Sequence, residues 1–239
     1  MTGPFVLAAD VETELVERRS RFMTRLHRVA SVEQAEQLIR AARRQLADDL
    51  ADVTGQQWRT RSLCGEWDTE QVLAHLTAAA RVGQWRWIRS IVGSGFRPAV
   101  HNARRLREQL GDTPAGTYAR FRESIELRIA PSKDLAAYLG EVLVHGEDIR
   151  RPLGIDAPPS TDAGTAVLDF YVSRDFTVPS RRTSRGLGLR ATDAPFASGE
   201  GPEVTGPARA LMMTLAGRPQ YLDQLSGPGA VILRERLSR

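Results

Sequence analysis

GEVLVHGEDIRR, residues 140–151, places Glu141, His145 and Asp148 four and three positions apart. These spacings put side chains on one face of an α-helix. At about 100° per residue, His145 and Asp148 both fall within about 40° of Glu141. The stripe borders the face formed by the Val, Leu and Ile residues of the same stretch. It is therefore either a functional site or the polar edge of an amphipathic helix.

The surrounding residues predict where this helix begins and ends. Pro131 interrupts the chain just before it, so we expect the helix over Ser132–Arg151. Pro152 and Gly154 are expected to end it. Asp134 would then lie on the same face as the Glu141 stripe.

Further helices are predicted upstream, because apolar residues recur every three or four positions. Two of them begin at sequences that have the form of a capping box, Ser31 with Gln34 and Asp68 with Gln71. The first extends to Leu50, and the second carries a histidine at position 75. The later ones are expected over Pro98–Leu110, with Gly111 in the C′ position, and from Thr113-Pro114 toward Ile129.

The pattern changes after residue 155. Asp156–Ser160 contains two prolines and is typical of a linker. Beyond it, Leu187 and Leu189 alternate with other residues like a short strand, Thr205–Ala216 predicts a helix, and Ala230–Leu233 predicts another strand. We therefore expect a mainly helical α+β protein. It would comprise an extension over residues 1–30, an up-down four-helix bundle over 31–155 and a small α+β domain over 156–239.

The N-terminal extension allows two interpretations. Val11–Arg28 is rich in charge and could form an extra helix, or it could be a solvated or partly disordered arm.

Composition limits the protein classes. Hydrophobic residues make up 41% and charged residues 26%, the single cysteine excludes an internal disulfide, and no apolar run is long enough to span a membrane. The opening residues lack a signal peptide's basic region, so we expect a cytoplasmic protein. Because 29 acidic residues are interspersed among 33 basic ones, nucleic-acid binding by a basic N-terminal arm is only a minor hypothesis.

His75 can supply a third ligand to the Glu141/His145 stripe if two helices of the bundle face each other. Two imidazoles and one carboxylate with an open fourth position form the ligand set of a catalytic zinc site. The alternative is a hydrogen bond between Glu141 and His145 on a half-exposed face, with His75 in the core. Spacing alone leaves both interpretations open.

Two motifs carry a family resemblance. LCGEWDTEQVLAHL, residues 63–76, followed by GEVLVHGEDIRRPLG, residues 140–154, resembles the mycothiol-dependent maleylpyruvate isomerase family, a branch of the DinB-like metal-binding four-helix bundles. The tail from Gly206 to Leu233 is similar to a C-terminal domain that these proteins often carry. The resemblance implies a divalent metal, typically zinc, bound by His75, Glu141 and His145. Asp148 would orient a ligand imidazole from behind.

The resemblance also implies a reaction class. In this family the open metal position takes water or the sulfur of mycothiol, and a metal deprotonates a thiol whose ordinary pKa is about 8.5. The thiolate adds to an activated double bond, the resulting single bond rotates, and elimination leaves the trans isomer. We therefore expect a mycothiol-using thiol transferase or cis–trans isomerase that acts on a small molecule as a monomer or homodimer. No catalytic group is expected beyond the metal-bound thiol or water.

Other residues have weaker assignments. Arg150, Arg182 and Arg185 could bind the anionic groups of substrate or thiol. Cys64 is expected to be a small buried residue. In a different class of protein, a metal-stabilised regulatory protein without turnover, Cys64 or Asp148 would close the metal site as a fourth ligand.

Overall fold

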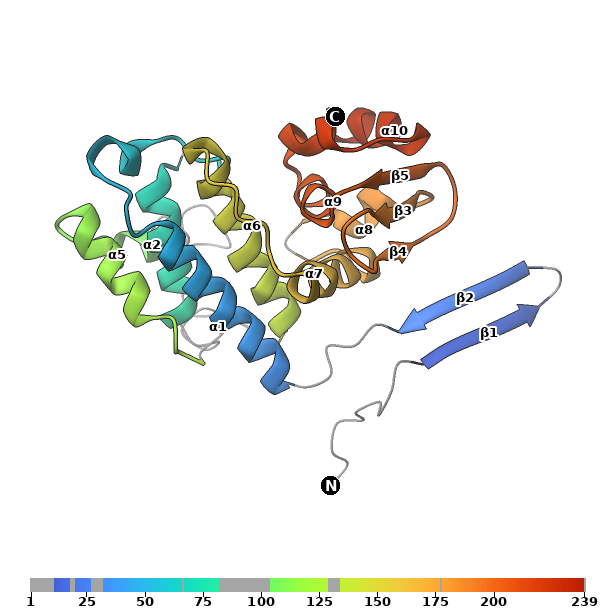
Figure 1. Cartoon of the computed structure of the whole chain (residues 1–239), viewed down its shortest axis with the longest axis horizontal. Coiled ribbons are helices and arrows are strands. Elements are labelled where there is room, and N and C mark those ends of the chain that lie inside the picture. The colour runs from blue at the N-terminus through green and yellow to red at the C-terminus, as the bar shows by residue number, and fades with distance from the viewer. Residues whose placement is uncertain are drawn as a thin grey trace, which may run out of the picture.

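Within the part of the chain that the structure describes, four helices of ten residues or more lie in the N-terminal part of the molecule, and Figure 1 shows them packed together. The computed structural model describes residues 11–17, 20–26, 32–65, 67–81, 104–128, 134–176 and 178–238. The four helices are α1 (Val32–Asp49), α2 (Thr69–Arg81), α5 (Pro114–Glu123) and α6 (Leu135–Leu153). Helix α6 contacts both α1 and α2, and α5 contacts both as well, so the four pack as a bundle. This arrangement confirms the predicted helical bundle.

Helix α6 begins three residues later than expected. The Asp134 side chain caps it by accepting a hydrogen bond from the Ala137 amide at 3.3 Å, and Gly154 ends it with a φ of 71°. Asp134 also forms an ion pair with Arg174. The expectation that Asp134 belongs to the Glu141 stripe is therefore wrong, because a capping residue lies at the end of the helix and not on its face.

Pro152 lies inside the last turn of α6 and has no amide hydrogen to donate to the Asp148 carbonyl one turn earlier. The Leu63 amide fills that position, at 3.0 Å from the Asp148 oxygen. Leu63 belongs to the loop that leads into α2, so this hydrogen bond holds that loop against α6. The loop also closes on itself, because Ser62 accepts from the Cys64 amide at 3.0 Å.

Helices α2 and α5 begin as their sequences predict. In the Asp68/Gln71 capping box, the Asp68 side chain accepts from the Gln71 amide at 2.8 Å and the Gln71 side chain accepts from the Asp68 amide at 3.0 Å. Thr113 caps α5, and Pro114 follows in its first turn. The Ser31/Gln34 box lies partly outside the described residues.

A buried hydrogen-bond network joins α2 to α5. Thr117 donates to Glu70 at 2.7 Å and accepts from the Gly111 amide at 2.8 Å, while Arg59 pairs with the other Glu70 oxygen at 2.7 Å. Glu70 and Thr117 are buried. The network fixes the relative position of the helix that carries His75.

The C-terminal part surrounds a small sheet. Its elements are α7 (Thr161–Ser173), α8 (Ser180–Ser184), β3 (Gly188–Ala191), β4 (Ala197–Ser198), β5 (Glu203–Gly206), α9 (Ala208–Leu215), the 3₁₀ helix η2 (Pro219–Gln224) and α10 (Pro228–Leu237). The strand order is β4-β3-β5, with β3 antiparallel to β4 and parallel to β5. The molecule is therefore α+β and mainly helical, as predicted.

Helix α7 joins the two parts, because it contacts both α6 and α9. Val167 and Leu168 of this helix are fully buried, and one continuous apolar core extends from α1 to α10. Figure 1 shows α7 between the bundle and the sheet.

Several expectations need correction. Ala230–Leu233 is helical in α10, because Gly227, with a φ of 93°, and Pro228 start a helix there. Thr205 belongs to β5, so α9 begins at Ala208.

Two helical predictions nearer the N-terminus also differ from the structure. Val11–Glu17 (β1) and Ser20–Leu26 (β2) form an antiparallel hairpin where a helix or a disordered arm was expected. The alternation of Val11, Thr13 and Leu15 with acidic residues favours a strand. In the helix expected from Pro98, residues 104–107 are helical and residues 98–103 lie outside the described part.

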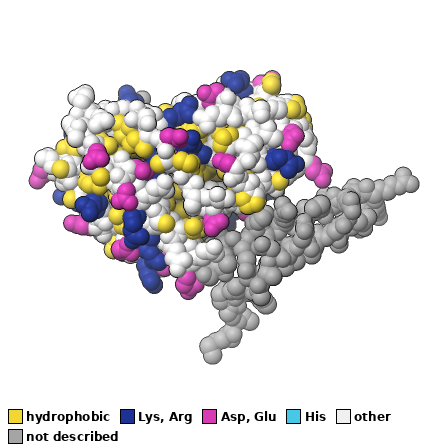
Figure 2. Space-filling model, viewed as in Figure 1, with side chains coloured by type: hydrophobic (Ala, Val, Ile, Leu, Met, Phe, Trp, Pro, Cys, Tyr) yellow, Lys and Arg dark blue, Asp and Glu magenta, His cyan; other side chains and the backbone are white. Residues whose placement is uncertain are grey.

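Among the described residues, no helix combines the length and apolarity that crossing a membrane requires. Acidic and basic side chains are interspersed on the face of the molecule that Figure 2 shows.

Candidate metal centre

His75 of α2 meets Glu141 and His145 of α6. The His75 Nε2 atom lies 3.6 Å from Glu141 Oε2, and the His145 Nε2 atom lies 3.3 Å from the same oxygen. The two imidazole rings meet edge to face, with 5.0 Å between their centroids. The structure thus brings together the three residues that the sequence proposed as ligands.

The arrangement fits a divalent metal ion. One ligand atom from each of the three residues lies within 4.8 Å of the others. Ligand atoms around a tetrahedral zinc ion are roughly 3.3 Å apart, given bonds of about 2.0–2.1 Å. The side chains are 13%, 29% and 12% exposed for His75, Glu141 and His145, so the cluster is sheltered without being closed.

The pKa values of the two histidines shift in opposite directions. Burial lowers the pKa of His75, even though the Glu141 carboxylate opposes this shift. Burial would also lower the pKa of His145, but hydrogen bonds with Asp148, Cys64 and Glu141 outweigh it and raise that pKa well above the usual value. Burial would raise the pKa of Glu141, yet hydrogen bonds from the two histidines lower it strongly. The carboxylate is therefore ionised at neutral pH.

Asp148 contacts the edge of the His145 ring that faces away from Glu141. The His145 Nδ1–H group donates to Asp148 Oδ2 at 2.9 Å, which leaves Nε2 directed toward Glu141. Asp148 is fully buried, and Arg218 binds both of its oxygens, at 2.9 and 2.6 Å. Burial would raise the pKa of Asp148, but the hydrogen bonds from His145 and Arg218 lower it.

The loop before α2 contributes two neighbours. Cys64 is half-buried, and its sulfur forms a second group of possible ligand atoms with His145 and Asp148, all within 4.8 Å of one another. The expectation that Cys64 is merely a buried packing residue therefore misses its place beside His145. The Trp67 ring packs against His75, with 5.1 Å between the ring centroids.

Comparison with known proteins finds a family model that is similar to part of the bundle. Residues 39–130 match the family model described as the mycothiol maleylpyruvate isomerase N-terminal domain. The match covers less than half of the chain, so it shows that residues 39–130 are similar to that domain. The family domain includes His75, whereas Glu141 and His145 follow it in the sequence.

Two solved structures share the fold over the bundle and beyond. One is the mycothiol-dependent maleylpyruvate isomerase, at 17% identity and a TM-score of 0.55, and the other is a histidine-to-alanine mutant of such an enzyme, at 16% and 0.56. Each comparison covers 84% of this chain and 94% of the other. No curated protein sequence matches the chain.

The arginines proposed from sequence do not gather around His75, Glu141 and His145. Arg150 is buried, and its Nε atom binds Asp49 of α1 at 2.7 Å. Arg182 and Arg185 line a separate pocket beside α8. Arg218, which sequence reasoning missed, binds Asp148 directly behind His145. Only its place in the resembling tail segment, between Gly217 and Pro219, could have drawn attention to it.

Proposed function

We propose that the protein is a metal-dependent enzyme that uses mycothiol as a thiol transferase or as a cis–trans isomerase of the maleylpyruvate type. The convergence of His75, Glu141 and His145 is the observation that carries the proposal. Two imidazole nitrogens and one carboxylate oxygen suit zinc and leave a fourth position for water or thiol. The similarity of residues 39–130 to the mycothiol maleylpyruvate isomerase N-terminal domain supports mycothiol as the thiol.

A divalent ion held by these residues would lower the pKa of a thiol at its open position, which generates a nucleophile at neutral pH. The chain's own residues prepare the ligands. Asp148 accepts a hydrogen bond from the Nδ1–H group of His145 and so keeps the Nε2 atom directed toward Glu141. Arg218 in turn fixes the Asp148 carboxylate through two hydrogen bonds.

Burial prepares His75 to bind a metal. It lowers the pKa of His75 and so keeps the imidazole neutral near pH 7, as a metal ligand must be. Its ring is supported on one side by Trp67. These contacts hold the ligand atoms in place before any ion binds, which reduces the ordering cost of binding.

The test is an assay of the full-length protein with maleylpyruvate and a panel of electrophilic thiol acceptors, with and without mycothiol. We expect turnover that requires mycothiol, is abolished by a chelator and returns with zinc. His75→Ala should lose both zinc and turnover, whereas Glu108→Ala, which removes an exposed carboxylate, should keep both. Turnover without mycothiol, or full turnover in metal-free protein, would rule the proposal out.

The position of Cys64 beside His145 favours a second candidate, a metal-stabilised regulatory protein without turnover. In that protein the Cys64 thiolate would occupy the fourth position. Cobalt-substituted protein distinguishes the two candidates through its visible spectrum. A cysteine-to-cobalt absorption band that Cys64→Ser removes, together with no response to mycothiol, would favour the regulatory protein. A band that arises only when mycothiol is added would favour the enzyme.

A further inference from the structure

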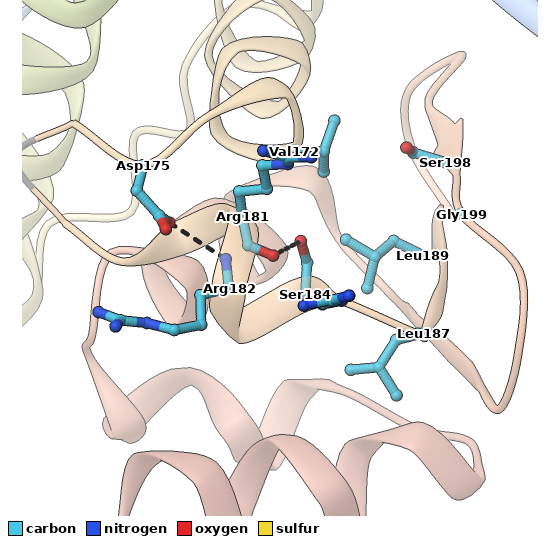
Figure 3. Close-up of a pocket in the computed structure, with 11 residues that line it drawn as sticks. Val172, Asp175, Arg181, Arg182, Ser184, Leu187, Leu189, Ser198 and Gly199 are labelled. Carbon is cyan, nitrogen blue, oxygen red and sulfur yellow. Dashed lines mark hydrogen bonds between the residues drawn. The ribbon is translucent and has the colours of Figure 1, made fainter.

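A pocket lies in the C-terminal part, between α8 and the sheet. Its volume is about 450 Å³. In Figure 3, Arg181, Arg182 and Ser184 of α8 lie on one side, and Leu187, Leu189 and Ser198 of the strand region lie on the other. None of His75, Glu141 and His145 lines it. The pocket is therefore separate from the candidate metal centre.

The charge in this pocket is strongly positive. Three arginines, Arg181, Arg182 and Arg185, and one acid, Asp175, are among its lining residues. Within the described part of the chain, the three guanidinium groups have no hydrogen-bond or ion-pair partner. The Asp175 carboxylate accepts from the Arg182 backbone amide at 3.1 Å and from no arginine side chain of this group. Three exposed arginines thus share a concave surface without matching anions.

The opposite wall is apolar and preformed. Leu187 and Leu189 are buried at its base, and Val172 adds a half-buried side chain from α7. The backbone at Gly199, with a φ of 77°, passes so close that a Cβ atom there would lie 2.3 Å from the Leu187 carbonyl oxygen. Only glycine permits this approach, so the wall has a fixed shape.

We propose that this pocket binds a small organic oxyanion, a carboxylate or a phosphate monoester that carries an apolar group. Guanidinium groups bind the planar or tetrahedral oxygens of such anions through paired hydrogen bonds. The apolar group would lie against Leu187 and Leu189. The volume is within the range of roughly 300–1,000 Å³ that is usual for small-molecule sites. This proposal is independent of the metal centre and of the reaction proposed there.

The experiment is an NMR titration of the isotope-labelled full-length protein, read at the amides of Gly186 and Gly199. Both glycines line the pocket, so their shifts report local binding. The probes are phenyl phosphate, benzoate, inorganic phosphate and benzyl alcohol. We expect saturable shifts with phenyl phosphate or benzoate, and the tighter of the two identifies the anionic group. Inorganic phosphate should bind more weakly because it lacks the apolar group, and the neutral alcohol should not bind.

Two variants test the lining. Arg181→Gln/Arg185→Gln should weaken binding of the better aromatic anion by at least about tenfold, through loss of charge-assisted hydrogen bonds. The control, Arg107→Gln/Arg234→Gln, removes the same charge from two exposed arginines elsewhere and should bind within about twofold of the unmodified protein. Ser198→Phe keeps every charge and should block binding by filling the pocket.

Each of the following results would overturn the proposal. They are equal affinity in the Arg181/Arg185 variant and in its control, binding of benzyl alcohol as tight as that of the anions, or titration shifts that bypass Gly186 and Gly199. Inorganic phosphate as tight as phenyl phosphate would overturn the assignment of an apolar group. If circular dichroism shows that the double variant is unfolded, Ser198→Phe alone tests the proposal. Unchanged binding in that variant would then overturn it.

Discussion

Arg218 and Asp148 lie 70 residues apart in the sequence and form a bidentate ion pair. The Arg218 Nε atom binds Asp148 Oδ1 at 2.9 Å, and Nη2 binds Oδ2 at 2.6 Å. Asp148 also receives the Nδ1 hydrogen of His145. Arg218 therefore links the C-terminal part to the candidate metal centre.

Removal of Arg218 should destabilise the fold. Arg218→Ala leaves the fully buried Asp148 carboxylate without its main partner, and breaking such a pair costs about 3–5 kcal/mol. Chemical denaturation of the metal-free protein measures the change. Arg190→Ala is the matched control, because the Arg190–Glu203 pair is more than half exposed and is worth at most about 1 kcal/mol. Equal losses in the two variants would contradict the structural role of the Arg218–Asp148 pair.

Asp148→Asn should weaken metal binding without removing a ligand. The amide cannot stabilise the His145 imidazole as the carboxylate does, so the pKa of His145 should fall and the ring should lose its fixed orientation. Replacements at such positions typically cost about 10–100-fold in metal affinity. Competition with a chromophoric chelator measures zinc affinity. Unchanged affinity in a folded variant would show that Asp148 does not support the ligand.

Zinc affinity should rise with pH. The pKa of His145 is raised well above its usual value, so its imidazole is protonated in metal-free protein at neutral pH and must lose that proton to bind an ion. His75 has a lowered pKa and Glu141 is ionised, so neither adds a proton to be released in this range. Binding near pH 7 should therefore release about one proton, and the dependence should level off above the pKa of His145.

Calorimetry in buffers of different ionisation enthalpy counts this proton. Asp148→Asn should reduce the release, because it lowers the pKa of His145. Release of two protons, or a zinc affinity independent of pH, would contradict the opposite pKa shifts of His75 and His145.

Thr117→Val should loosen the contact between α2 and α5. The substitution preserves shape but leaves the buried Glu70 oxygen and the Gly111 amide without their partner. The expected loss is about 1–3 kcal/mol in free energy of unfolding. Thr113→Ala is a useful comparison, since it removes only an exposed cap hydrogen bond at the start of the same helix. A loss in Thr117→Val no larger than that of the cap variant would contradict the network's importance.

Local sequence signals predicted the elements that local interactions stabilise. The capping box at Asp68 and Gln71 and the Thr113-Pro114 start formed as expected, since their hydrogen bonds join residues three positions apart. Helix α10 was missed because Ala230–Leu233 is a short apolar run, which fits either a strand or a helix. The glycine and proline that precede it decide the outcome.

The site was predictable in part for the same reason. Glu141, His145 and Asp148 share one helix, so spacing placed them together. His75 required a second helix and was suggested by its type and by the resemblance. Arg218 could not be predicted from periodicity, because its contact with Asp148 depends on how η2 and α9 pack against α6.

Because Pro152 has no amide hydrogen, it affects a segment that is remote in the sequence, the loop before α2. Because it leaves the Asp148 carbonyl free, the Leu63 amide attaches there, and Cys64 follows directly in the chain. Replacing Pro152 with alanine would offer the carbonyl a rival donor from within the helix. A substitution at position 152, which supplies no ligand atom, would thus loosen the segment that carries the Cys64 sulfur beside His145.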